Sequence, residues 1–350
     1  MGRDARTYMV SIAIVGSGVG GVRSVLQKLS LALKREGFNI YLLQTSKRFR
    51  SLKEINEIKK YDVVIFSSSA FPTHIFINNV KFLLFIHGYR IHELMNYALR
   101  YQKLSIISGL YSLAKYIIFS KYISKIDRYI CHSITTCEAN MIKDRYIVLP
   151  QFVFSEELKN FRSYIFNNST IEKKYIRIVT YYSFVDSPRL LNDIQLLKLL
   201  KIITSNINKL VEFILVDPRQ HTTSIDGKIG HLIVKRIPFQ PRNLFMTLLA
   251  SADLYIERCI DEELGMGSID AALVGTPIAK LTHPAFTNRQ DYEDEILWAS
   301  SVKGFADSIK DYILNIDYWK PYYSKKLTEF LVRKRNWDNI KQPLLEILRS

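Results

Sequence analysis

The feature that most constrains the fold is an alternation of short apolar strands with helices, which occurs twice along the chain. The strand-like runs of the first half lie at residues 8–15, 40–43, 62–66, 82–86, 128–131 and 146–149. Those of the second half lie at residues 176–182, 211–216, 231–234 and 254–258, with helices at 188–206 and 242–250. Strands that alternate with helices build a parallel sheet covered on both faces. The sequence therefore predicts an α/β protein with two Rossmann-like domains.

The chain length of 350 residues agrees with two domains of roughly 150 residues each. We place the N-terminal domain at residues 1–155 and the C-terminal domain at residues 170–335, because the polar stretch 161–174 has the composition of a linker. No run reaches the roughly 18 uncharged apolar residues of a membrane span, and the N-terminus lacks the pattern of a signal peptide. We therefore expect a cytoplasmic protein.

A glycine-rich loop follows the first predicted strand. Its spacing, Gly16-x-Gly18-x-x-Gly21, satisfies the dinucleotide-binding fingerprint. That fingerprint also requires an acidic residue at the end of the second strand to hold the adenosine ribose, and here the strand ends in Gln44 and Thr45. The residues alone leave two interpretations open, a dinucleotide-binding oxidoreductase and a tight strand–helix turn that binds no ligand.

Two carboxylates, Glu262 and Asp270, stand eight positions apart across a glycine-containing turn that leads into an apolar helix. The amides of Gly265, Met266 and Gly267 are predicted to open this helix, where unpaired N–H groups and the positive end of the helix dipole attract a diphosphate. Asp270 falls about one turn into the helix, placed to accept hydrogen bonds from two ribose hydroxyls. The alternative is a solvated acidic loop before a core helix.

Residues 262–277 resemble the Glu-x7-Glu signature of retaining glycosyltransferases of the family-4 type, which have the GT-B fold. Asp270 stands where the family has its second Glu, and Gly275 and Pro277 lie at the family's offsets. The resemblance implies two Rossmann-like domains that face each other across a cleft, with the nucleotide sugar bound by the C-terminal one. It also implies that the final amphipathic segment, about 336–350, packs back on the N-terminal domain.

The resemblance assigns roles to residues of both halves. His87, in a Phe-Ile-His-Gly sequence, is similar to the acceptor-side histidine of the family. His87 and Glu262 are the two expected catalytic residues. The loop that contains Gly20, Gly21 and Arg23 is similar to the family's Gly-Gly-Val loop. It would line the acceptor cleft near the donor phosphate.

The basic pair that neutralises the leaving diphosphate in this family is only partly present. Ser183 occupies the position of the Arg, and Arg189 is expected to stand in for the Lys, so both are assigned to donor binding. The loss of one cation removes a charge-assisted contact to the phosphate. This departure favours the alternative of a degenerate GT-B protein that binds a nucleotide or glycan without turnover. Glu257, Asp217 and Arg219 lie near predicted strand ends and are further candidates.

The sequence contains no Asp-x-Asp motif of the kind that binds a metal ion in other glycosyltransferases. The resemblance therefore implies a metal-independent enzyme of the hexosyltransferase type, which moves a sugar from a nucleotide diphosphate sugar to an acceptor hydroxyl. We expect no metal and no cofactor. The nucleotide sugar is the expected donor substrate.

The positive charge of the chain is concentrated in its first half. Residues 1–170 hold 24 Lys and Arg against 11 Asp and Glu, which accounts for most of the net charge of +16. A basic N-terminal half favours an anionic, lipid, glycan or protein acceptor, or peripheral contact with an anionic membrane surface. Nucleic acid is not favoured as a partner. A surface that only keeps the protein dispersed in water is the alternative.

Three cysteines, Cys131, Cys137 and Cys259, show no Cys-x-x-Cys spacing. Neither a disulfide framework nor a zinc site is predicted from an odd number of cysteines without such spacing. We expect all three to be small buried residues.

Overall fold

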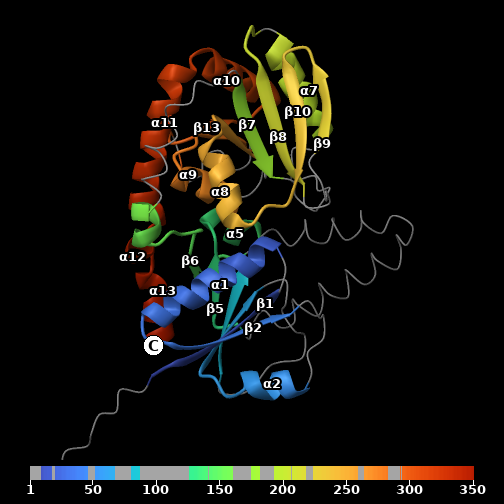
Figure 1. Cartoon of the computed structure of the whole chain (residues 1–350). Coiled ribbons are helices and arrows are strands. Elements are labelled where there is room, and N and C mark those ends of the chain that lie inside the picture. The colour runs from blue at the N-terminus through green and yellow to red at the C-terminus, as the bar shows by residue number, and fades with distance from the viewer. Residues whose placement is uncertain are drawn as a thin grey trace, which may run out of the picture. The chain divides into compact units, whose positions relative to one another are not determined.

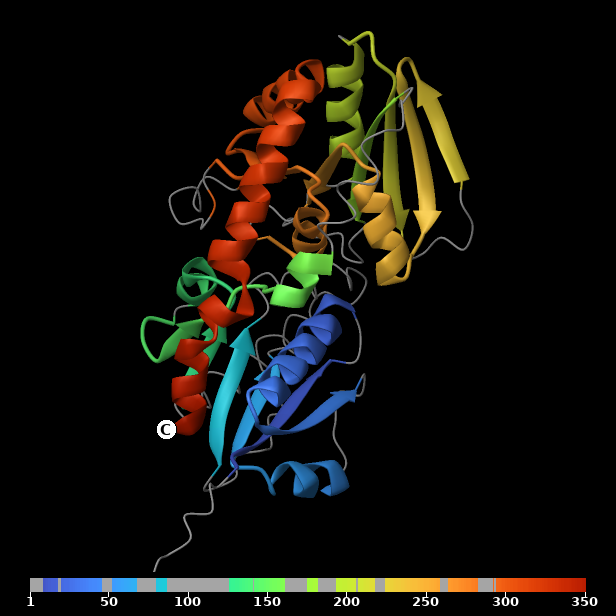
Figure 2. The same cartoon turned by 60° about the vertical axis from the view of Figure 1, so that its left-hand side comes forward.

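The computed structural model describes residues 9–17, 20–45, 52–67, 80–86, 126–140, 142–160, 175–181, 193–205, 207–217, 224–258, 264–282, 292 and 294–350. The chain divides into two compact units (Figures 1 and 2). Unit 1 comprises residues 1–150 and 341–350, and unit 2 comprises residues 151–340. The return to unit 1 therefore begins at Lys341, later than the position near residue 336 inferred from the sequence.

Unit 1 is built on a six-stranded parallel sheet with the strand order β2-β1-β3-β4-β5-β6. The strands are β1 (Ser11–Ser17), β2 (Asn39–Thr45), β3 (Val63–Ser67), β4 (Lys81–Ile86), β5 (Arg128–Cys131) and β6 (Tyr146–Val148). The described helices of this unit are α1 (Gly20–Arg35), α2 (Leu52–Ile58), α5 (Ile134–Ala139) and α13 (Gln342–Arg349). Each of the six strands lies where the apolar runs predict one. The Tyr- and Lys-rich stretch at about 91–125, for which the sequence predicts helix, lies outside the described residues.

Helix α1 packs closely on β1 because a glycine faces it from the strand. A Cβ atom on Gly16 would lie 1.9 Å from Leu26 Cδ1 and 3.2 Å from Ser67 Cβ, so a larger residue would force the buried Leu26 side chain to move. Leu26, Leu29 and Leu33 are fully buried at helical spacing. The chain leaves the helix through Gly37, whose φ of 88° favours glycine. Gly16 thus has a packing role that requires no ligand.

The C-terminal helix α13 belongs to unit 1 and is held there by packing and by cations. Leu344, Leu345 and Leu348 form its buried face. Lys81 Nζ donates to the Ile347 carbonyl at 2.6 Å, a favourable place for a cation near a helix C-terminus. Trp337, by contrast, lies in unit 2, where its ring centroid is 4.7 Å from that of Phe152.

Unit 2 is built on a seven-stranded sheet with the strand order β13-β12-β11-β7-β8-β10-β9. The strands are β7 (Ile176–Tyr181), β8 (Val211–Asp217), β9 (Ser224–Ile229), β10 (Leu232–Pro238), β11 (Leu254–Glu257), β12 (Ile278–Leu281) and β13 (Leu297–Ala299). All neighbouring pairs are parallel except β9 and β10, which are antiparallel. The edge strands β9 and β13 (Figure 1) and the short strand β12 are absent from the strands predicted from the sequence, which interprets the chain after residue 281 as helical.

Helices cover both faces of the sheet in unit 2. They are α7 (Asp193–Ser205), α8 (Arg242–Ala250), α9 (Met266–Leu273), α10 (Val302–Leu314) and α11 (Ile316–Phe330), followed by a π-helical turn (Leu331–Arg335) and α12 (Trp337–Ile340). Phe213 and Leu215 of β8 pack in one core with α7 and α10, whereas Ile214 packs in a second core with α8 and α9. This alternation places α9 and α10 on opposite faces of the sheet. No helix among the described residues is long and apolar enough to cross a membrane.

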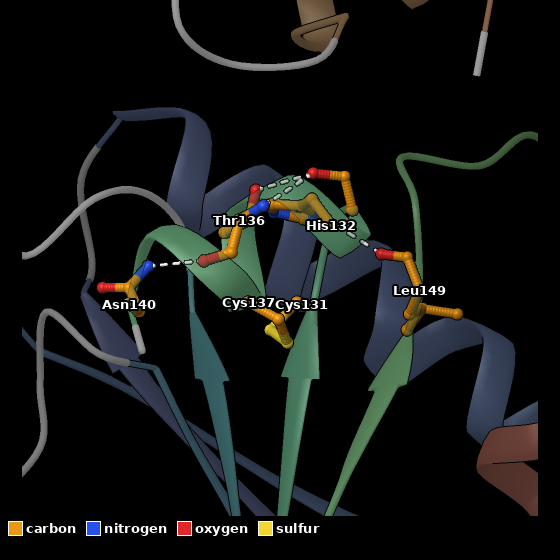
Figure 3. The surroundings of a disulfide bond; sticks show 7 residues. Cys131, His132, Thr136, Cys137, Asn140 and Leu149 are labelled. Atoms are coloured by element: carbon orange, nitrogen blue, oxygen red, sulfur yellow. Dashed lines mark hydrogen bonds between the residues drawn. A yellow bond between two sulfur atoms is a disulfide. The ribbon is translucent and has the colours of Figure 1, made fainter. Parts of the chain in front are cut away.

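The structure corrects the prediction for two of the cysteines. Cys131, the last residue of β5, forms a disulfide with Cys137 of α5 (Figure 3), although both are buried as expected. The Ser133 hydroxyl oxygen accepts a hydrogen bond from the Thr136 amide at 3.0 Å and so fixes the turn at the start of α5. This strand–turn–helix connection brings the two sulfur atoms together, a proximity that the sequence spacing does not reveal. Cys259 lies outside the described residues.

A buried carboxylate in the sheet of unit 2 gives a prediction for the pH dependence of stability. Glu212 of β8 has a side chain that is only 2% exposed, and it accepts hydrogen bonds from Arg177 Nε at 2.7 Å and from Lys235 Nζ. Burial raises the pKa of Glu212, but the bonds from Lys235 and Arg177 outweigh burial and lower the pKa below its ordinary value. Its stabilising contribution is therefore fully present above the unfolded-state pKa of about 4.3, and it is lost as the pH falls through the lower folded-state pKa.

We expect Glu212→Gln to lower the free energy of unfolding by about 1.5–3 kcal/mol at pH 7, because two cations lose a charged partner. The difference from wild type should shrink as the pH falls below about 4. Urea unfolding at several pH values measures both effects, with the exposed Glu329→Gln as the control variant. An equal difference at pH 7 and at low pH would contradict the assignment.

Candidate functional site

Helix α9 begins at the carboxyl edge of the sheet in unit 2, where ligands bind in open α/β folds. It follows β11, which lies between β12 and β7 in the interior of the sheet. Gly265 is the N-cap, with φ −72° and ψ 176°, and Met266 is the first helical residue. The amides of Met266 and Gly267 point out of the first turn without an intrahelical partner, as the geometry of an α-helix dictates. The helix starts at the residues predicted from the sequence.

A buried carboxylate from the strand occupies part of this helix terminus. Glu257, the last residue of β11, is 7% exposed. Its Oε2 accepts hydrogen bonds from the Ser268 hydroxyl at 2.6 Å and from the Gly265 amide at 3.3 Å. The Gly265 amide, which the sequence predicts to bind a diphosphate, donates to Glu257 in the structure. Ser268 was missed, because nothing in the sequence pairs it with a residue that lies before the turn.

Side chains of β11 lie close beneath the glycines at the start of α9. A Cβ atom on Gly267 would lie 2.3 Å from the Tyr255 hydroxyl oxygen. One on Gly265 would lie 3.2 Å from Glu257 Oε2, a tight contact. The contact with Tyr255 explains the glycine at position 267 without a ligand.

Asp270 lies one turn into α9 and is held by an arginine of the neighbouring helix. Asp270 Oδ1 accepts from Arg242 Nη2 at 2.8 Å and from Nε at 3.2 Å. Arg242, the first residue of α8, also pairs with Glu157 Oε1 at 3.1 Å. The Asp270 side chain is 8% exposed, whereas the Arg242 side chain is half-exposed. A ribose bound to Asp270 would therefore share this carboxylate with Arg242.

Arg242 places a permanent positive charge next to Asp270. Burial lowers the pKa of Arg242, but the charges of Asp270 and Glu157 outweigh burial and raise it. A second cation, Arg258, is 5% exposed and directly follows Glu257. Neither arginine is predicted from the sequence to belong to the donor site. Arg242 lies 28 residues before its partner Asp270, and no motif joins them.

The remaining predicted site residues are only partly described. His87, Glu262, Ser183 and Arg189 lie outside the described residues. In unit 1, Gly20 and Gly21 are the first two residues of α1.

The end of β2 in unit 1 carries no acidic residue that could hold an adenosine ribose. Gln44 Nε2 donates to the backbone carbonyl of Arg23 at 3.0 Å, and Gln44 Oε1 accepts from Gln27 Nε2 at 3.3 Å. Arg23 itself is exposed. The strand end where a dinucleotide fold needs an acid is thus joined to α1 by amide side chains. Over the described part of the chain, no group of three or more His, Cys, Asp or Glu side chains is placed to hold a metal ion.

No protein-family model matches the sequence, and a comparison with curated protein sequences finds no match. Solved structures do match over nearly the whole chain. Sucrose-phosphate synthase from Thermosynechococcus elongatus gives a TM-score of 0.64 at 12% identity, covering 97% of this chain and 98% of that one. The chain has the GT-B fold.

Two further GT-B structures were solved as ligand complexes. HepE from Anabaena, in complex with UDP and glucose, gives a TM-score of 0.63 at 12% identity and covers 98% of this chain and 100% of that one. The catalytic domain of starch synthase IV from Arabidopsis thaliana, bound to ADP and acarbose, gives 0.57 at 10% identity, with 97% and 99% covered. At identities of 10–12%, these TM-scores show a shared fold.

Proposed function

We propose that this protein is a retaining, metal-independent glycosyltransferase of the hexosyltransferase type, which transfers a sugar from a nucleotide diphosphate sugar to an acceptor hydroxyl. The observation that carries the proposal is the start of α9, where first-turn amides, the buried Asp270 and the cation of Arg242 occur together at the carboxyl edge of a parallel sheet. The complexes of GT-B proteins with UDP and with ADP support a nucleotide sugar as the donor.

In this proposal the diphosphate binds at the amides of Met266 and Gly267, and the ribose hydroxyls donate to Asp270. Negative charge grows on the leaving diphosphate as the glycosidic bond breaks. The positive charges of Arg242 and Arg189 stabilise this negative charge on the diphosphate. They take the place of the cation that the family has at the position of Ser183. No cofactor takes part.

Retention follows when the acceptor hydroxyl attacks from the face that the diphosphate leaves. The protein then contributes positioning and electrostatic stabilisation rather than a covalent intermediate. By the resemblance, Glu262 contacts the donor sugar and His87 approaches the transferring sugar from unit 1. The loop of Gly20, Gly21 and Arg23 contributes to the acceptor side.

The test is a screen of UDP-, GDP- and ADP-sugars for hydrolysis and transfer, with and without a chelator. The proposal predicts that one donor class is consumed, that the released sugar keeps its anomeric configuration by NMR, and that chelation leaves the rate unchanged. Tight nucleotide binding without turnover of any donor would instead support a degenerate binding protein. A strict requirement for manganese or magnesium would contradict the metal-free mechanism.

His87→Ala should lower the rate of sugar transfer far more than it lowers nucleotide affinity. The reason is that His87 belongs to unit 1, whereas the nucleotide is proposed to bind unit 2. Loss of general acid–base or hydrogen-bonding assistance lowers rates by roughly 10²–10⁴-fold. Steady-state rates and calorimetric affinities for the nucleoside diphosphate measure the two effects separately. An equal loss in both would contradict the assignment.

The charge of the first half supports an acceptor that is anionic or carried on an anionic membrane surface. Co-sedimentation with liposomes should then depend on anionic lipid and fall at high salt, because exposed charges are screened beyond about 10 Å at 0.1 M salt. Neutral liposomes serve as the control. If the protein stays in the supernatant under every condition, a non-membrane anionic acceptor is favoured.

A further inference from the structure

A cavity of about 260 Å³ lies in unit 2 beside β13, α10 and α11. Its lining includes two half-buried tryptophans, a tyrosine, two aspartates and a serine: Trp298, Trp319, Tyr323, Asp294, Asp311 and Ser308. The proposed donor site does not use this cavity, because none of the residues that line it belongs to β11, α8 or α9. The cavity is smaller than the roughly 300–1,000 Å³ of sites for drug-sized ligands, so a single small ring suits it.

The aromatic wall of the cavity is held in place before any ligand binds. The ring centroid of Trp319 lies 5.7 Å from that of Tyr323, with the planes inclined by 34°, and 5.7 Å from that of Tyr322, with the planes inclined by 79°. Trp319 Nε1 donates to Asp311 Oδ2 at 2.8 Å, which fixes the orientation of the indole. Such a wall offers a flat apolar surface at low entropic cost.

The polar side of the cavity consists mainly of hydrogen-bond acceptors. Asp311 accepts from Trp319 through Oδ2 and from Asn315 Nδ2 through Oδ1 at 2.9 Å, which leaves lone pairs on both oxygens. Asp294 Oδ2 accepts from Lys326 Nζ at 2.7 Å and from the Tyr322 hydroxyl at 3.2 Å. These bonds lower the pKa of Asp294, led by the one from Lys326. The cavity therefore suits a ligand that donates hydrogen bonds.

The charges around the cavity decide which kind of hydrogen-bond-donating ligand fits it. An anion would meet the charge of Asp311 at short range and is disfavoured. Asp294 is already neutralised by Lys326, so an organic cation would gain only the charge of Asp311 within a chain of net charge +16. A neutral polyhydroxylated ring satisfies the carboxylates with its hydroxyls and covers the indole with its C–H face.

We propose that this cavity binds one neutral sugar residue, either free or at the end of a glycan, between the rings of Trp319 and Tyr323 and the carboxylates of Asp311 and Asp294. The site is separate from the proposed donor site and does not depend on sugar transfer. Its affinity should be on the order of 1 mM, as expected for a ligand of about 12 non-hydrogen atoms.

Intrinsic fluorescence provides the test, because Trp298 and Trp319 are two of the three tryptophans in the chain. We expect titration of the full-length protein with glucose, galactose, N-acetylglucosamine or a neutral trisaccharide to quench or shift the emission with saturation. A trisaccharide that binds more tightly than its monosaccharide would identify a glycan end as the ligand. Inorganic phosphate, choline and UDP serve as comparison probes.

Asp311→Asn should weaken the sugar titration about tenfold, and Trp319→Phe should weaken it about threefold. Asp317→Asn, an exposed change on α11 outside the cavity, should have no effect. All three variants should bind nucleoside diphosphates as the wild type does, so failure here is distinguishable from failure of the proposed function. Absence of any saturable sugar response, unchanged sugar affinity in Asp311→Asn, or tighter binding of choline than of every sugar would overturn the proposal.

Discussion

Asp270→Asn is expected to weaken the binding of the nucleoside diphosphate by about 1.5–3 kcal/mol, roughly 10- to 150-fold, without unfolding the protein. A carboxylate accepts two hydroxyl hydrogens of a ribose, whereas an amide offers one acceptor oxygen and an NH₂ group that cannot accept. The fold should survive, because Arg242 is half-exposed and keeps Glu157 as a partner. Isothermal titration calorimetry measures the affinity, and urea unfolding checks the fold.

The matched control for this prediction is Glu157→Gln. It removes the other carboxylate from Arg242 at 3.1 Å but leaves the bonds between Arg242 and Asp270 intact. Its effect on nucleotide affinity should stay within about 0.5 kcal/mol, as for most surface substitutions. If the two variants weaken binding equally, Asp270 acts only by positioning Arg242, and its assignment to the ribose is wrong.

Gly267→Ala should destabilise unit 2 by about 1–3 kcal/mol and weaken nucleotide binding as well. By helix propensity alone, alanine would be more stable than glycine inside a helix. The expected loss of stability therefore depends entirely on packing. The new Cβ would lie 2.3 Å from the Tyr255 hydroxyl oxygen, and the start of α9 must move to relieve this overlap. Any such shift displaces the first-turn amides that the diphosphate is proposed to use.

Tyr255→Phe should rescue part of the stability lost in Gly267→Ala, because the nearest atom then becomes Cζ at 3.1 Å. The control is Gly304→Ala in the first turn of α10, where the nearest contact is Ser301 Oγ at 3.1 Å. This control should change stability by no more than about 0.5 kcal/mol. Equal destabilisation by Gly267→Ala and Gly304→Ala would show that the Tyr255 contact does not explain Gly267.

Most of the buried parallel strands could be predicted from the sequence because each is a short, continuous apolar run between polar turns. All seven residues of β8, for example, are buried, and such a run admits few other interpretations. β9 could not be predicted in this way, since Ser224-Ile-Asp-Gly-Lys-Ile229 contains polar residues and lies at the sheet edge. β13 has only three residues and forms mainly because β12 provides a partner.

The start of α9 was predictable because capping and dipole effects act within a few residues of each other. The contacts that join distant positions were not. Glu257 and Ser268 are 11 residues apart, and the Arg242–Asp270 pair depends on α8 and α9 packing side by side on one face of the sheet. The disulfide of Cys131 and Cys137 likewise depends on the turn geometry between β5 and α5.

The most direct test of the proposed nucleotide site is calorimetric titration of the full-length protein with UDP, GDP and ADP, the matching nucleosides, and the 2′- and 3′-deoxy forms of whichever diphosphate binds. We expect that one diphosphate binds and that its nucleoside binds far more weakly. Loss of either ribose hydroxyl should reduce affinity in the wild type but not in Asp270→Asn. Binding of NAD or FAD in preference to every nucleoside diphosphate, or equal affinity for the ribose and deoxyribose forms, would contradict the proposed site.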